Sequence, residues 1–355
     1  MMNIKDISKF QTDPSLFDGT ELVLVVKSQN QLERRQNMIT YLTTGKIGRA
    51  EQRGVATGLL VRGRVANGVF NVDWTREYLE PRHIVPFHDG YLLTAIDRII
   101  ILDNNFKETQ QILHPDFSGL HALNVSADQT RFLVTSSGFD RLLEFTCDGD
   151  SFHESWSWKG WEHGFNPTDE GVWITDDPEL RRSYEEEGKP VCFIDKREYG
   201  PEGVPIAKRT MHPNIAVYDK YDGERSIILS SGVEGELFRI DRFTKKVERI
   251  CNHLHKMPHG LIPFREGWAI VDTTVGEWVQ MDRQFNVEER YSVKNVLGKP
   301  AIASEYEWVQ NFVPYRTGLF LVDANRGIFA VDLETDIFTL YTPNENWCIQ
   351  DILPV

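Results

Sequence analysis

The sequence predicts an all-β protein, a seven-bladed β-propeller whose C-terminal strand joins the N-terminal blade. A unit of strand, polar turn and strand recurs at intervals of 39 to 51 residues over most of the chain. The last residues repeat only the first part of this unit. Short strands at this period, separated by turn residues, are typical of propellers with four strands per blade. No long segment has apolar residues at helical spacing, which excludes a helical solenoid of similar period.

The repeat is clearest at His163 and His259, where His-Gly opens a short apolar segment followed by a Gly-x-x-Ile-x-Asp or related strand. The same frame identifies further copies. The aligned copies begin at Arg82, His121, His163, His212, His259, Gln310 and Gln350. A third strand with an apolar-x-Asp/Glu ending follows in five of them, and these third strands begin at Ile99, Leu142, Leu237, Trp278 and Ile328.

The two ends of the chain complement one another. Residues 348–355 have the pattern of an innermost strand with no blade after it, whereas residues 20–80 supply strands that lack a leading one. Pairing the two would close the ring and remove the open sheet edges. This composite blade and six internal blades make seven, with six and eight as the alternatives.

One domain is expected over residues 1–355, because 41% of them are hydrophobic and repeat proteins often exceed the usual domain length. Residues 1–19 form an N-terminal extension of this domain. Residues 176–190 form a charged insertion in the fourth blade, with room for one or two helical turns.

Composition narrows the classes of partner. The formal net charge of −14 argues against nucleic acid or an anionic membrane surface as the main partner. No apolar stretch is long enough for a membrane span, and the N-terminus does not resemble a signal peptide. The four cysteines are far apart and form no Cys-x-x-Cys pair, which is typical of reduced thiols in a cytoplasmic protein. We therefore expect a cytoplasmic protein that acts on a small molecule.

Ring geometry gives the aligned histidines a common location. The first strand of every propeller blade lines the central channel, so side chains at equivalent starting positions meet at one mouth. Neutral imidazole is the commonest protein ligand of borderline transition metals. The sequence predicts a divalent transition metal, with Fe(II) favoured, bound by His121, His163, His212 and His259. His163 and His259 are also the predicted catalytic residues.

Other side chains are expected at the same mouth as substrate contacts or as partners of the ligands. Asp176, Asp272 and Asp323 end second strands, where a carboxylate could accept the second N–H of a ligand histidine. Arg82, Gln310 and Gln350 occupy the ring positions that lack histidine. Trp161 and Glu162 directly precede His163.

Three classes of function remain open. A metal-dependent oxidoreductase or lyase would use iron to activate dioxygen, or a redox-inert ion as a Lewis acid. A metal-free lyase or transferase would use one channel histidine as general acid or base. A protein-interaction scaffold would need neither, since many propeller channels hold only polar side chains and water. The sequence contains no nucleophile elbow, phosphate-binding loop or dinucleotide fingerprint.

The segments at Glu162-His-Gly-Phe-Asn-Pro and Pro258-His-Gly-Leu-Ile-Pro resemble blades of streptogramin lyase, NHL and gluconolactonase-like propellers. This resemblance extends over residues 82–355 and implies a propeller fold. Its streptogramin lyase branch implies metal-assisted ring opening by elimination, although the full catalytic set has no match here. The four histidines are similar in number and architecture to those of carotenoid cleavage oxygenases, which hold ferrous iron near the axis of a seven-bladed propeller. That likeness is one of architecture, which does not establish function.

Overall fold

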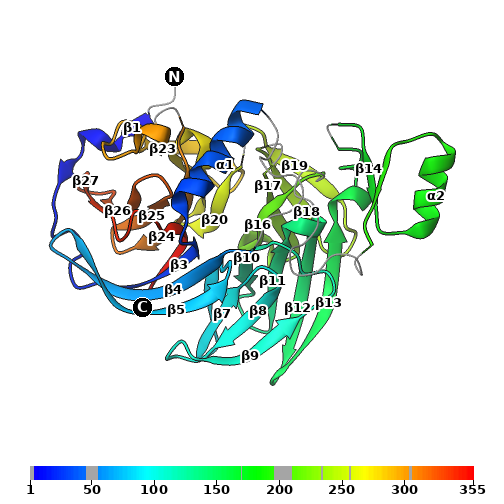
Figure 1. Ribbon diagram of the computed structural model, residues 1–355, viewed down its shortest axis with the longest axis horizontal. Coiled ribbons are helices and arrows are strands. Elements are labelled where there is room, and N and C mark those ends of the chain that lie inside the picture. Colours follow the sequence, from blue (N-terminus) through cyan, green and yellow to red (C-terminus); the bar gives the residue numbers. More distant parts are fainter. Residues whose placement is uncertain are drawn as a thin grey trace.

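The computed structural model of the protein describes residues 4–44, 55–168, 170–195, 210–232, 235–255, 257–303 and 306–355 (Figure 1). Within these residues, six antiparallel four-stranded blades form the ring. Blade 1 contains β28 (Cys348–Pro354), β3 (Glu21–Ser28), β4 (Thr57–Ala66) and β5 (Val69–Leu79). Blade 2 contains β6 (Ile84–Phe87), β7 (Gly90–Thr94), β8 (Arg98–Leu102) and β9 (Glu108–Leu113). Blade 3 contains β10 (Leu120–Val125), β11 (Arg131–Ser136), β12 (Arg141–Asp148) and β13 (Ser151–Lys159).

The second half of the ring repeats this arrangement. Blade 4 contains β16 (Pro213–Tyr218), β17 (Ser226–Ser231), β18 (Leu237–Asp241) and β19 (Val247–Cys251). Blade 5 contains β20 (His259–Phe264), β21 (Gly267–Asp272), β22 (Glu277–Met281) and β23 (Val287–Ser292). Blade 6 contains β24 (Val309–Tyr315), β25 (Gly318–Asp323), β26 (Gly327–Asp332) and β27 (Ile337–Tyr341). The propeller fold predicted from the repeat is therefore confirmed.

The ring closes in the way predicted from the sequences of the two chain ends. β28 pairs antiparallel with β3, so that Ile352 lies opposite Leu24 and the last strand becomes the innermost strand of blade 1. Side chains from the two strands enter one buried cluster with residues of blade 6, including Phe320 and Tyr341. Closure thus uses the C-terminal strand to satisfy the inner edge of β3.

The prediction of seven blades is wrong, because the unit that begins at His163 does not form a blade. Its described strands are β14 (Trp173–Thr175) and β15 (Val191–Phe193), which pair in parallel across α2 (Pro178–Glu186). A parallel pair with a crossover is a different unit from the antiparallel meander of a blade. Blades 3 and 4 also pack directly on one another, since one cluster joins Trp158 of β13 with Phe238 and Ile240 of β18. No room is left between them for a further blade.

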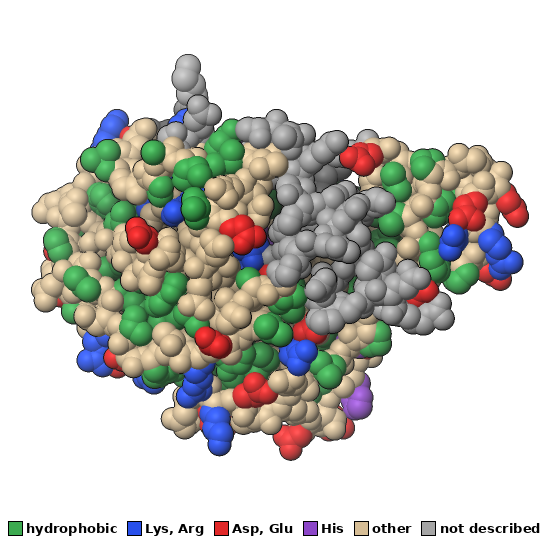
Figure 2. Space-filling view, in the orientation of Figure 1, with side chains coloured by type: hydrophobic (Ala, Val, Ile, Leu, Met, Phe, Trp, Pro, Cys, Tyr) green, Lys and Arg blue, Asp and Glu red, His purple; other side chains and the backbone are tan. Residues whose placement is uncertain are grey.

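The segment around α2 projects from the ring as a separate unit (Figure 1). The helix begins at the predicted charged insertion, where the Asp177 carboxylate accepts hydrogen bonds from the N–H groups of Glu179 and Leu180. Pro178 occupies the first turn, which it favours because it has no N–H to satisfy. None of the α2 side chains is buried, and charged groups gather over this unit in Figure 2. The insertion is therefore attached to the propeller without contributing to its ring.

The N-terminal extension runs along the outside of two blades. β1 (Ile4–Asp6) pairs in parallel with β23, and β2 (Gln11–Thr12) pairs in parallel with β27. Between them lies η1 (Ile7–Lys9), whose Ile7 side chain is buried with blades 5 and 6. This segment covers outer edges that would otherwise expose unpaired backbone groups.

The core of the ring lies between neighbouring blades. Six clusters of buried apolar side chains each join two adjacent blades, and together they complete a circle of six interfaces. The fully buried Trp158, Trp268 and Trp278 fill the interfaces between blades 3 and 4, 4 and 5, and 5 and 6. This packing holds the first strands in fixed positions around the channel. No helix in the described part of the chain is long and apolar enough to cross a membrane.

Candidate functional site

The first strand of most blades carries an irregularity at its channel position. In β10, β16, β20, β24 and β28 the register against the second strand shifts around His121, Asn214, Gly260, Gln310 and Gln350. A bulge inserts a residue that has no partner across the ladder and changes the direction of nearby side chains. The repeated shift therefore turns equivalent residues of successive blades into the channel.

These residues surround a small cavity at one mouth. Each blade contributes at least one polar side chain, and in ring order these are Gln350, Arg82, His121, Asn214, His259 and Gln310. His83 beside Arg82 and Asn311 beside Gln310 line the cavity as well. The cavity has a volume of about 20 Å³ for water-sized spheres. That is room for one or two water molecules or a single ion, and a whole substrate does not fit inside.

Three of the four histidines predicted as ligands lie at or beside this cavity, and we call them the histidine arc: His121, His212 and His259. The ring centroids of His121 and His212 are 5.1 Å apart, and those of His121 and His259 are 5.9 Å apart. His121 and His259 line the cavity. His212 directly precedes β16, and Asn214, two residues later, provides that blade's side chain in the cavity.

His259 is held in a defined tautomer. Its Nδ1 lies 2.7 Å from the carbonyl oxygen of Met257 and 2.9 Å from Oγ1 of Thr273. Because a carbonyl can only accept, Nδ1 donates its proton, and Nε2 keeps its lone pair. Burial lowers the pKa of His259 to about 4, so the ring is neutral near pH 7. A neutral ring with one nitrogen oriented by a carbonyl is the form in which histidine binds metals.

The buried His259 should make stability depend on pH. Its pKa in the folded chain, about 4, lies below the ordinary value of 6.5, so as pH falls the unfolded chain takes up the proton first. The contribution to stability is complete above pH 6.5 and is lost as pH falls towards 4. Between pH 7 and pH 5 we expect wild type to lose about 2 kcal/mol more than His259→Gln in urea unfolding. Equal losses in the two proteins would show that the folded chain can protonate His259 freely.

His163, the fourth predicted ligand, lies outside the channel. It follows η3 (Gly160–Glu162) at the end of the outer strand β13, and its ring stacks on Trp158 at a centroid distance of 5.4 Å. The structure therefore does not bring His163 to the histidine arc, nor does it support its predicted catalytic role there. The cause is the missing blade, since a residue after a fourth strand starts no new inner strand.

The other candidates around His163 share this outer location. The Trp161 side chain is buried in a small cluster with Ile174 of β14. Glu162 and Asp176 both pair with the ammonium of Lys159, at 2.9 Å each. These three residues attach the projecting unit to blade 3.

Three ring positions without histidine form the opposite side, which we call the donor arc: Gln310, Gln350 and Arg82. Nε2 of Gln350 donates to Oε1 of Gln310 at 2.6 Å. Nη1 of Arg82 donates to the carbonyl of Gly119, and Nη2 lies 3.3 Å from a carboxylate oxygen of Glu80. Arg82 is 4% exposed, and burial lowers its pKa to about 9, which leaves it charged at neutral pH.

Helix α1 (Gln31–Thr44), inserted between β3 and β4, is attached next to this arc (Figure 1). Nη2 of Arg34 donates to Glu80 at 3.1 Å, so that one buried carboxylate serves both Arg34 and Arg82. Nη2 of Arg35 donates to the carbonyl of Asn325 in the turn after β25. The helix thus connects blade 6 to the start of blade 2.

Asp272 and Asp323 end second strands as predicted, but their partners are not the channel histidines. Asp272 accepts from the backbone N–H of His255 and lies 3.0 Å from its Nδ1. Arg290 also binds Asp272, at 3.2 Å. Asp323 pairs with Arg326 and accepts from the N–H of Asn325.

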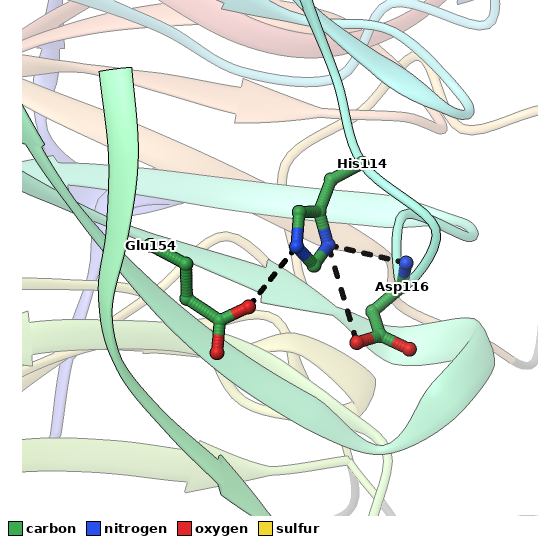
Figure 3. A group of neighbouring side chains, drawn as sticks. All are labelled: His114, Asp116 and Glu154. Atoms are coloured by element: carbon green, nitrogen blue, oxygen red, sulfur yellow. Dashed lines mark hydrogen bonds and ion pairs between the residues drawn. The ribbon is translucent and has the colours of Figure 1, made fainter.

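A cluster at the end of blades 2 and 3 was not predicted from the sequence. His114 lies between Asp116 and Glu154, with Nε2 3.0 Å from Glu154 and Nδ1 4.0 Å from Asp116 (Figure 3). Among the described residues, it is the one set of three His, Cys, Asp or Glu side chains whose ligand atoms all lie within 4.8 Å of one another. The guanidinium of Arg141 already pairs with both carboxylates. We therefore interpret the cluster as an ion-pair network that joins the two blades.

Comparisons with known proteins support the fold alone. No protein family model matches the chain, and no curated protein matches it. A protein of unknown function from Bacteroides caccae is 9% identical over 95% of this chain and 99% of its own, with a TM-score of 0.56. A chain of the nidogen/laminin complex is 10% identical over 94% and 97%, with a TM-score of 0.53. A 6-phosphogluconolactonase-like protein from Bacteroides uniformis is 9% identical over 86% and 83%, and its TM-score of 0.44 is too low to support an inference about activity.

Proposed function

We propose that the protein is a metal-dependent enzyme acting on a small molecule at the channel mouth, with a divalent transition metal bound by the histidine arc. The observation that carries the proposal is the approach of the His121 ring to both the His212 ring and the His259 ring, which come from three consecutive blades. Fe(II) remains the favoured ion, because an all-imidazole set without thiolate leaves coordination positions open for substrate or dioxygen.

The spacing of the rings supports a shared ion. Metal–nitrogen bonds of about 2.1 Å would place ring centroids about 5 to 5.5 Å apart around a tetrahedral or trigonal ion. The two centroid distances of 5.1 and 5.9 Å are close to that range. The ligand nitrogens do not yet converge within 4.8 Å of one another, so binding requires rotation of the rings about their side-chain bonds.

The tautomer of His259 favours metal binding over acid–base catalysis. A general base is most effective when its pKa lies near the working pH, and that of His259 lies near 4. The same low pKa removes competition between protons and a metal at neutral pH. Lewis-acid catalysis of a lyase reaction, or oxygenase chemistry with iron and dioxygen, is what a metal at this position would supply.

Metal analysis of the purified protein tests the proposal. After removal of metal by chelation and reconstitution with Fe(II) under anaerobic conditions, we expect about one ion per chain. Loss of one imidazole should weaken binding at least about 10-fold, so His121→Ala, His212→Ala and His259→Ala are the informative variants. His163→Ala and the exposed His153→Ala are matched controls that should bind as wild type does.

The outcomes separate the competing functions. Equal binding in wild type and in the variant that lacks all three arc histidines would overturn the metal site. Failure to bind any of Fe(II), Co(II), Ni(II) and Zn(II) would leave the metal-free enzyme and the interaction scaffold as the candidates. Loss of binding in His163→Ala as well as in the three arc variants would restore the four-histidine arrangement predicted from the sequence.

A further inference from the structure

A group of three buried charged side chains next to the donor arc has an excess of one positive charge. Two buried guanidinium groups, those of Arg34 and Arg82, share the single carboxylate of Glu80. The side chain of Glu80 is fully buried, and those of Arg34 and Arg82 are 10% and 4% exposed. Two positive charges against one negative charge leave one positive charge within this group, and Arg82 lies at the cavity. A further buried carboxylate, that of Asp351, accepts hydrogen bonds from Asn311 and from the backbone N–H of Ile84. A buried excess of positive charge favours an anionic ligand, which would compensate it.

Unused hydrogen-bonding atoms at the cavity also indicate a ligand. Nε of Arg82, a donor, and Oδ1 of Asn214, an acceptor, are buried and make no hydrogen bond within the described residues. Both side chains line the cavity, and Asn214 is 1% exposed. Because Oε1 of Gln310 accepts from Gln350, the N–H groups of Gln310 are available as further donors on the same side. Buried polar groups in native proteins almost always have a partner.

The wall is divided into two halves with different chemistry. Gln310, Gln350 and Arg82 are contiguous in the ring and line one side of the cavity together with His83, whereas His121, Asn214 and His259 line the other side. On the donor side, Arg82 and Gln310 present N–H groups. On the histidine side, Nε2 of His259 and Oδ1 of Asn214 present lone pairs.

We propose that the donor arc is a carboxylate subsite, and hence that the substrate of the proposed enzyme is a small carboxylic acid in its anionic form. Nε of Arg82 and the N–H groups of Gln310 donate to the carboxylate oxygens, and the remainder of the substrate extends from the mouth. Space for one or two water molecules accommodates the two oxygens of a carboxylate, whereas the four oxygens of phosphate exceed it. The assignment of this group to a substrate rests on the proposed function, but binding of the carboxylate itself does not require the metal.

Formate is the probe, because it is a carboxylate with no further carbon atom. Its three non-hydrogen atoms limit its affinity to about the millimolar range. Calorimetric titration of chelator-treated protein at pH 7.5 should show formate binding. Formamide, which is similar in shape and uncharged, and inorganic phosphate should bind at least about 10-fold more weakly.

Two variants, each at a different side chain, test the subsite, so that the conclusion does not depend on a single substitution. Gln310→Met removes the amide donor at nearly constant volume, and Arg82→Lys keeps the charge beside Glu80 while it removes Nε. Each should weaken formate binding at least about 10-fold, and circular dichroism and urea unfolding establish that each variant is folded. The exposed Arg316→Gln, in the turn between β24 and β25, is the control for loss of a cationic side chain and should bind formate as wild type does.

The results distinguish this inference from the proposed function. Formate binding to wild type that both subsite variants lose, together with no metal binding, would support the carboxylate subsite and overturn the metal enzyme. Metal binding with no formate binding, in metal-free or metal-loaded protein, would overturn the subsite and leave the metal site standing. Equal affinity for formate and formamide would also overturn the subsite.

Discussion

Replacing Arg326 by Met is expected to lower the free energy of unfolding by about 3–5 kcal/mol, because it leaves a buried carboxylate without its cation. The side chains of Arg326 and Asp323 are fully buried, and they pair with one another. Arg326 also binds Glu307 at 2.8 Å and donates from Nε to the carbonyl of Val296 at 3.0 Å. After the substitution Glu307 keeps Lys299, whereas Asp323 keeps only the N–H of Asn325 among these partners. Urea unfolding at pH 7 measures the difference.

Two further proteins control this experiment. Arg283→Met removes a cation of similar size from an exposed pair with Glu266, and it should change the stability by less than about 1 kcal/mol. Adding Asp323→Asn to Arg326→Met removes the charge left uncompensated, so part of the lost stability should return. A loss below about 1 kcal/mol for Arg326→Met alone would show that water reaches Asp323 in the folded chain.

The position of Asp323 was predictable from the sequence, but its partner was not. Strand periodicity and the repeat correctly placed Asp272 and Asp323 at the ends of second strands, on the face of the channel mouth. Which side chain each carboxylate meets depends on turns whose geometry the repeat does not specify. In the turn after β25, Arg326 returns to Asp323 three residues earlier. In blade 5, the loop before β20 brings His255 to Asp272.

The sequence contains a feature that distinguishes the unit wrongly counted as a blade from the true blades. Every other internal unit has a third strand with an apolar-x-Asp/Glu ending or an equivalent, and the unit after His163 has none. Its first two segments resemble the repeat, because Gly171 is followed by the apolar strand Trp173–Thr175 as Gly267 is followed by the rest of β21. A three-residue strand cannot supply one layer of a blade interface, and the side chains of blades 3 and 4 meet directly instead. A count based on third strands would have given six blades.

Most of the residues that line the cavity follow the repeat frame even though the blade count was wrong, and Asn214 in place of His212 is an exception. Each first strand determines its own channel residue through the local register, so removing one unit leaves the others in place. The removal takes His163 out of the ring, and in blade 4 Asn214 rather than His212 lines the cavity. The wall therefore has His121, Asn214 and His259 on the side opposite the donor arc. The carboxylate Glu80, which compensates the donor arc, lies two residues before its ring position, outside the repeat frame.

Replacing Glu80 by Gln should have the other large effect, a loss of about 3–5 kcal/mol, because it removes the one carboxylate between two buried guanidinium groups. The amide keeps one of the two acceptor oxygens, so its NH2 group faces the other guanidinium, and the charges of Arg34 and Arg82 then repel one another. Oε1 of Glu80 also accepts from the N–H of Ala56, so the change weakens the attachment of the segment before β4. Urea unfolding measures the loss for the whole chain. We expect an additional local loss at α1, since α1 is held to the mouth partly through Arg34.

Hydrogen exchange locates that effect. In Glu80→Gln the acceleration of exchange relative to wild type should be at least about 10-fold larger for the amides of α1 than for those of β20 and β24, which should change only by the loss of global stability. Glu77→Gln removes a carboxylate from an exposed position three residues earlier on β5 and should leave both measurements within about 0.5 kcal/mol of wild type. Equal acceleration in α1 and in the inner strands would mean that Glu80 stabilises the ring as a whole. Acceleration that is larger in α1 than in β20 and β24 would show that Glu80 chiefly holds the helix to the mouth.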